Sequence, residues 1–225
     1  MRALALACLG VAAQAQTGFP FQDETLHYTI NFPSGLSLGE GTMAARRNRE
    51  TSAWHLELKL DASLAGLALT DRYRSVASGY CSSEFEKESE HGPRKARETV
   101  VIGGGIAKRA TKGGGTSSYP VGECARDALT FLYYTRRELG QGRVPAPETI
   151  VFGGPYQMRL EYTGAQTVTV GGKPEISDRV VVHLKGPASA TRLEMYFARD
   201  AARTPLVVKA PLALGTFSLE LVRQP

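Results

Sequence analysis

The stretch from Trp54 to Asp61 reads WHLELKLD and alternates apolar with polar side chains without a break. A period of two is typical of a strand with one buried face, because successive side chains of an extended chain point to opposite sides. The apolar members of this stretch, which share one side, are Trp54, Leu56, Leu58 and Leu60. This pattern predicts a half-buried β-strand.

Similar alternation recurs on both sides of this stretch, between clusters of glycine and proline that favour turns. The predicted strands are 26–32, 38–47, 53–64, 70–78, 82–89, 95–102, 149–152, 156–162, 166–170, 176–184, 190–198, 205–209 and 216–222. They follow one another at intervals of about ten residues, which is typical of an antiparallel meander. We therefore expect an all-β fold that forms a barrel or half-barrel.

One segment, DALTFLYYTRRELG from Asp127 to Gly140, breaks the alternation. It begins with a good N-cap residue, ends at a glycine, and places Arg136 and Arg137 near the negative end of the helix dipole. We predict a helix over about 127–139. Its apolar residues occupy more than one face, so the helix should be buried on several sides, with the curved sheet wrapped around it.

The composition is that of a globular protein: 225 residues, 42% hydrophobic and 22% charged. After a leader over residues 1–15, the remaining 16–225 are expected to form a single β-rich domain. The net charge of +5 is spread along the chain rather than concentrated on one element. We therefore expect no nucleic-acid partner.

The first residues have the pattern of a signal peptide. Arg2 precedes an apolar run that ends in the small-x-small sequence Ala13-Gln14-Ala15. We predict cleavage near Ala15 and a periplasmic or secreted protein without a transmembrane segment, since no apolar run approaches the ~20 residues that a membrane-spanning helix needs. Lipid attachment at Cys8 is the alternative, although little apolar sequence precedes it.

Export would leave Cys81 and Cys124 in a compartment where disulfides persist. We predict a disulfide between them, with two separate buried thiols as the alternative. Neither cysteine has a second Cys or His at metal-ligand spacing, so we expect no metal site.

Residues that carry chemistry are scattered. The four histidines stand singly, and no Gly-x-Ser-x-Gly motif is present for a serine nucleophile. Charged residues over 84–98 surround a turn at Gly92 and indicate a solvated two-stranded ribbon with cross-strand ion pairs. The sequence therefore indicates no catalytic residue and no cofactor, and we lean towards a non-enzymatic protein.

The chain resembles the domain of unknown function 3108 family. The matching pieces, in the expected order, are Leu26-His27-Tyr28, Gly39-Glu40-Gly41, the helical stretch 127–136, the segment 200–206 and Gly215. The resemblance implies an exported, β-rich protein. It transfers no catalytic residue to this chain, because the family has no established activity.

Two sets of residues are candidates for a ligand site. The first is an apolar wall formed by one face of the strand at 53–64, with residues of the predicted helix opposite it. The second is the tyrosine and arginine cluster of that helix, which would either anchor the helix to the sheet or orient a carboxylate or phosphate. Helix anchoring is the simpler interpretation. Together the candidate residues are Trp54, Leu56, Leu58, Phe131, Tyr133, Tyr134 and Arg136.

Three functions remain open. The first is an exported, non-enzymatic envelope protein whose half-barrel binds an apolar or amphipathic ligand such as a lipid. The second is a structural or assembly module that binds another envelope protein through a sheet edge. The third is a hydrolase of envelope polymers, which would need Ser, His and Asp to converge in a cleft.

Overall fold

The computed structural model describes residues 23–64, 66–187, 189–212 and 215–223, which form fourteen strands and one helix. In chain order the elements are β1 (Glu24–Asn31), β2 (Ser37–Arg47), β3 (Trp54–Leu64), β4 (Leu67–Ser78), β5 (Cys81–His91), β6 (Arg94–Gly103), β7 (Ile106–Thr111), β8 (Thr116–Pro120), α1 (Ala128–Gly140), β9 (Glu148–Val151), β10 (Pro155–Val170), β11 (Lys173–Lys185), β12 (Ala190–Ala198), β13 (Pro205–Leu212) and β14 (Gly215–Leu221).

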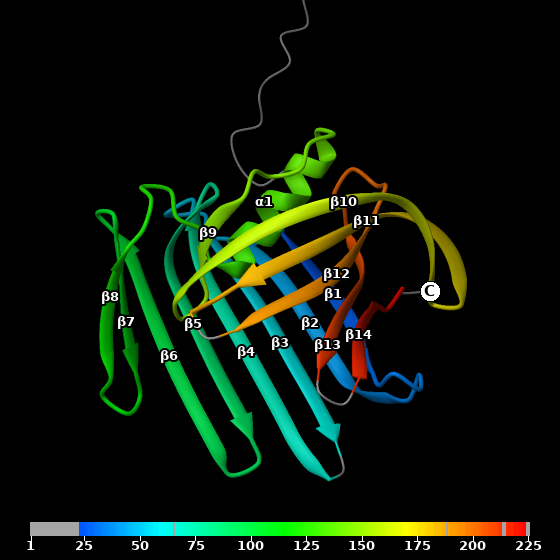
Figure 1. The fold of residues 1–225 in the computed structure, drawn as a ribbon, viewed down its shortest axis with the longest axis horizontal. Coiled ribbons are helices and arrows are strands. Elements are labelled where there is room, and N and C mark those ends of the chain that lie inside the picture. Colours follow the sequence, from blue (N-terminus) through cyan, green and yellow to red (C-terminus); the bar gives the residue numbers. More distant parts are fainter. Residues whose placement is uncertain (1–22, 65, 188, 213–214, 224–225) are drawn as a thin grey trace, which may run out of the picture.

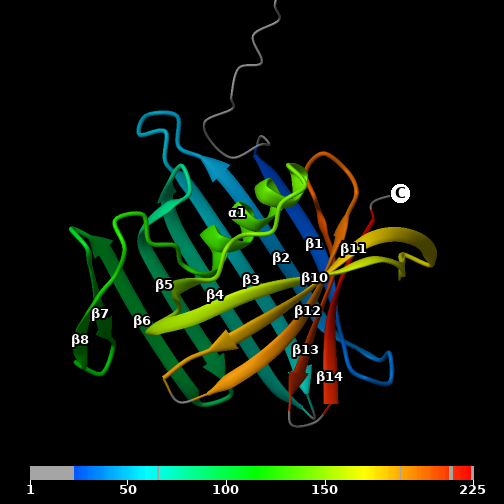
Figure 2. The same cartoon turned by 45° about the horizontal axis from the view of Figure 1, so that its top comes forward.

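The strands form one antiparallel sheet built from two meanders. The first runs from β1 to β8 and the second from β9 to β14, and pairing between β1 and β14 joins them. The sheet is not closed, because β8 and β9 remain its two ends. It curves so that β10, β11 and β12 cross in front of β3 and β4, with α1 on the concave side (Figure 1, and Figure 2 from above). The prediction of an antiparallel half-barrel wrapped around one helix is confirmed.

The strand from which the fold was predicted, β3, lies in the middle of the first meander. In its register with β2 and β4, Leu58 lies opposite Met43 on one side and Tyr73 on the other. Paired residues of adjacent strands point to the same face of a sheet, so these three side chains lie together. This is the face towards α1, and we call it the concave face; the opposite face is the convex face.

The sequence predicts no strand between residues 103 and 148, where the structure has the hairpin of β7 and β8. Its strands are short, and their apolar face is small, with Ala107 and Tyr119 packed against the core beside the backbone pairing with β6. The glycine clusters that flank them do form turns, with positive φ at Gly104, Gly105 and Gly114. The strands predicted at 156–162 and 166–170 are one strand, β10, whose register shifts between Tyr162 and Ala165.

The helix begins as predicted, with Asp127 as its N-cap. The Asp127 carboxylate accepts hydrogen bonds from the backbone N–H groups of Leu129 and Thr130, at 2.8 and 3.1 Å. The helix extends one residue beyond the predicted end, through Gly140, and the residue in the left-handed conformation is Gly142, at φ +71°. Buried residues occur along its whole length, as its apolar circumference predicts.

A disulfide joins Cys81 to Cys124, as predicted, and so ties the start of β5 to the segment that leads into α1. Among the described residues, α1 is neither long nor apolar enough to cross a membrane. The predicted leader and Cys8 lie outside the described residues.

Candidate functional site

The concave face of β3 runs from a packed region into an accessible one. Beneath α1, Trp54 and Leu56 are 6% and 1% exposed. Further along the same face, Leu58 and Leu60 are only half-buried. One apolar row therefore contributes both to the core and to the surface that the concave face presents beyond the helix.

The packed region contains most of the predicted ligand residues, in two separate clusters. Trp54 and Leu56 pack in one cluster with Tyr133, which is fully buried. Phe131 lies in another cluster with Met158 of β10. The structure therefore brings the predicted wall of β3 against Tyr133 but not against Phe131.

Tyr134 is half-buried and packs against both clusters. Its ring lies 3.8 Å from the guanidinium carbon of Arg126, measured to the ring centroid, and 5.7 Å from the ring of Tyr80. A cation over an aromatic face is attracted to it electrostatically. Tyr134 thus fastens the helix to the loop that precedes it and to the turn before β5.

Arg136 is 1% exposed and is held by groups of the protein itself. Its guanidinium pairs in bidentate fashion with Glu24 of β1, and its Nε donates to the carbonyl of Ala202 at 3.0 Å. Burial raises the pKa of the Tyr133 hydroxyl, which lies beside the same pair. This arrangement has the geometry of the helix-anchoring interpretation, and a ligand role for Tyr133, Tyr134 and Arg136 stays a prediction.

The other end of α1 is fixed by a buried polar cluster. One Asp127 oxygen caps the helix, and the other accepts hydrogen bonds from the hydroxyls of Ser75 and Thr130. Burial, opposed by these hydrogen bonds, raises the pKa of the Asp127 carboxyl. Asp127 and Ser75 are 0% and 2% exposed, so the contact between them lies in the core and not in a cleft.

Beyond the helix, half-buried apolar side chains continue the concave face. Leu60 of β3 and Leu219 of β14 both lie over Gly41 of β2: a methyl group added at Gly41 would be 3.1 Å from Leu60 and 3.5 Å from Leu219. Leu58 and Tyr73 pack against the edge of the core beside them. We call Leu58, Leu60, Leu219 and Tyr73 the apolar wall.

Next to the apolar wall, the concave face of β5, β6 and β7 forms a hollow of about 490 Å³. Lys87, Glu98 and Arg109 contribute its charged groups. Lys95, Arg97 and Lys112 also border it but belong to the convex side, where Lys95 and Arg97 pair with glutamates and Lys112 lies opposite Arg97. The turn between β9 and β10 covers one side of the hollow, where the Lys87 ammonium lies 4.9 Å from the centroid of the Phe152 ring. We call this feature the basic hollow.

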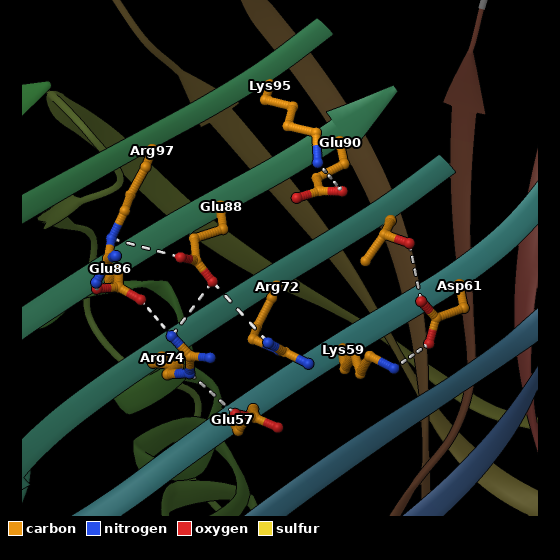
Figure 3. A network of polar contacts seen from close by, with 11 residues as sticks. Glu57, Lys59, Asp61, Arg72, Arg74, Glu86, Glu88, Glu90, Lys95 and Arg97 are labelled. Atoms are coloured by element: carbon orange, nitrogen blue, oxygen red, sulfur yellow. Dashed lines mark hydrogen bonds and ion pairs between the residues drawn. The ribbon is translucent and has the colours of Figure 1, made fainter. Parts of the chain in front are cut away.

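The basic hollow was missed because sequence reasoning placed all charged residues of 84–98 in one solvated ribbon. Most of them do form that ribbon: on the convex face Arg74 bridges Glu57 and Glu86, and Arg97 also pairs with Glu86 (Figure 3). Alternation separates Lys87 and Glu98 from this ladder, since their strand neighbours point the other way. The period of two was the signal that could have found them.

Two histidines contact carboxylates other than that of Asp127. His91 lies 3.1 Å from Asp71, and His183 lies 3.0 Å from Glu161. The convergence of Ser, His and Asp that the hydrolase hypothesis requires is therefore not present in these pairs.

The two ends of the sheet differ. The segment before α1 covers β9, since the Val151 N–H donates to the Arg126 carbonyl at 2.8 Å and Asp127 bridges to Val151. Within the described residues, β8 pairs only with β7. One strand edge is thus open to a partner.

The sequence profile of a family described as "Protein of unknown function (DUF3108)" matches residues 25–222. The chain belongs to this family. No curated protein matches the sequence.

Among solved structures, the chain is similar to a β-barrel-like protein of the domain of unknown function DUF1849 from Brucella abortus. The TM-score is 0.64 at 7% sequence identity, over 90% of this chain and 96% of that chain. At this identity the likeness concerns the fold alone.

Proposed function

We propose that this member of the family is an exported, non-enzymatic envelope protein that binds an amphipathic ligand, such as a lipid, on its concave face. The observation that carries the proposal is the apolar wall, where the core face of β3 continues past α1 into half-buried leucines. The predicted leader and the Cys81–Cys124 disulfide support export to the periplasm or beyond.

The packed region limits where such a ligand can bind. Trp54, Leu56 and Tyr133 are buried against one another, so they support the site from behind. Contact with a ligand falls to Leu58 and Leu60, which remain partly accessible. Each methylene group that leaves water on such a surface contributes about 0.8 kcal/mol, so a short acyl segment would be held.

The test is saturable binding of a fluorescent fatty acid to delipidated protein. We expect the wild type to bind and Leu58→Arg to lose binding, because the substitution places a charge on the surface that would contact the apolar chain. Val101→Arg is the matched control, since Val101 is 54% exposed on the convex face and gains the same charge.

Melting temperatures separate loss of binding from loss of fold. If Leu58→Arg unfolds, Leu60→Gln replaces it as a milder polar change on the same wall. Absence of saturable binding by folded wild-type protein would contradict the proposal.

The open edge of β8 favours a second candidate, a module that binds another envelope protein by strand addition. The Val121 N–H donates to Gly105 and the Thr111 N–H donates to Gly115, so the odd-numbered residues bond towards β7. The backbone groups of Thr116 and Ser118 therefore point outward, and β8 carries no charged side chain that would disfavour pairing with another strand.

Hydrogen exchange in periplasmic extract tests this second candidate. A partner strand should protect the Thr116 and Ser118 amides relative to buffer, and Ser118→Pro should abolish that protection. Equal exchange in extract and buffer would count against an edge partner.

A further inference from the structure

The basic hollow carries positive charge that the protein does not neutralise. Among its charged side chains Glu98 is the one carboxylate, and it pairs with Arg109. Lys87 forms no ion pair with a carboxylate of the described residues. The Lys87 ammonium therefore remains available to an anion.

An anion beside Lys87 would be held more strongly than an anion on an open surface. Lys87 is half-buried, and its ammonium lies over the Phe152 ring, which stacks on Tyr73 at 5.5 Å between centroids. Apolar surroundings lower the local dielectric and strengthen a charge-assisted hydrogen bond.

The basic hollow adjoins the apolar wall on the same face. Leu58 pairs with Tyr73 and Tyr73 pairs with Lys87, so these side chains form one row across three adjacent strands. Two strand spacings separate Leu58 from Lys87, roughly 10 Å. Glu98 of β6 lies opposite Lys87 at the end of this row, and it is paired with Arg109.

We propose that the basic hollow binds the anionic headgroup of an amphipathic ligand, a carboxylate or a phosphate, whose chain lies along the apolar wall. This inference rests on the proposed function and adds the chemical class of the ligand. Lys87 holds the headgroup, and Arg109 is kept in place by Glu98.

The experiment compares ligands that share one chain and differ in the headgroup. Calorimetry with delipidated protein measures decanoate, decyl phosphate and decanol. We expect at least one of the two anions to bind about tenfold more tightly than decanol, since a hydrogen bond to a charged group contributes that much. The tighter of the two anions identifies a carboxylate or a phosphate headgroup.

Variants then assign the effect to the hollow. Lys87→Gln should weaken binding of the preferred anion about tenfold and leave decanol unchanged. Lys108→Gln is the matched control, because Lys108 is exposed on β7 and does not line the hollow. It removes the same charge and should leave the binding of all three ligands unchanged.

The outcomes separate the headgroup site from the carrier function. Equal binding of the three amphiphiles, unaffected by the lysine variants, would overturn the headgroup site and leave the carrier function standing. Binding of none would overturn both. Inorganic phosphate binding as tightly as decyl phosphate would also overturn the inference, because the chain would then contribute nothing.

Discussion

On the concave face of β3, Trp54 and Leu56 lie beneath α1, whereas Leu58 and Leu60 lie beyond it. The four residues belong to one alternating stretch and share one face of one strand. The first two are closed off by the helix, and the last two keep part of their surface exposed. Strand periodicity therefore selects a face, while the element packed on that face decides whether it becomes core or binding surface.

The largest loss of stability is expected at the ion pair that joins α1 to β1. Arg136→Gln should lower the free energy of unfolding by about 3–5 kcal/mol, because it leaves the largely buried Glu24 carboxylate without its cation. Urea unfolding measures the loss. The double variant Glu24→Gln/Arg136→Met is the control and should recover part of it, since neither unpaired charge remains.

The next prediction addresses the two halves of β3 directly. Leu56→Ala should cost about 3 kcal/mol because it leaves a cavity in packed surroundings, whereas Leu58→Ala should cost about 1 kcal/mol. Thermal and urea unfolding of the two variants provide the measurement. Equal losses would mean that the packed region extends past α1, and the distinction drawn here would fail.

A smaller effect is expected at the start of α1. Asp127→Ala should cost about 1–2 kcal/mol, because the first-turn N–H groups and the Ser75 hydroxyl lose their acceptor. Asp127→Asn should cost less, since its amide oxygen can still accept. Unfolding in urea at neutral pH compares the two, and equal losses would show that the charge, not the acceptor, matters.

The smallest effect is a pH dependence of the stability that the buried Asp127 contributes. Burial raises the pKa of Asp127 in the folded protein above its ordinary value of 3.8, so the folded state binds this proton more tightly than the unfolded chain. This contribution to stability is complete below the ordinary pKa and is lost as pH rises through the raised one.

The measurement is the difference in unfolding free energy between wild type and Asp127→Asn as pH rises from the ordinary value of 3.8. The wild type should lose stability relative to the variant over this range. A relative gain would show that the hydrogen bonds to the carboxylate outweigh its burial.

Much of the fold could be predicted because the local alternation of apolar and polar residues indicates its strands. Alternation over 53–64 identified β3 and its apolar face, and Asp127 identified the first turn of α1. The weakly patterned hairpin of β7 and β8 could not be found in this way, because only Ala107 and Tyr119 give it an apolar face and it depends on pairing with β6.

For the candidate site, sequence reasoning identified Leu58 but did not separate it from the buried Leu56. It also grouped Lys87 with the convex ladder, although alternation turns Lys87 to the concave face. What it lacked in both instances was knowledge of which distant segment passes over the strand.

The sequence by itself determined the all-β class, the helix that interrupts it and the two cysteines that pair, since these follow from backbone geometry, residue type and the expected compartment. Tertiary structure alone decided that Glu24 meets Arg136, 112 positions away, and that the β9–β10 turn places Phe152 beside Lys87. The physical reason is that side-chain direction is set by neighbouring residues, whereas burial and charge pairing depend on chain segments that only folding brings together.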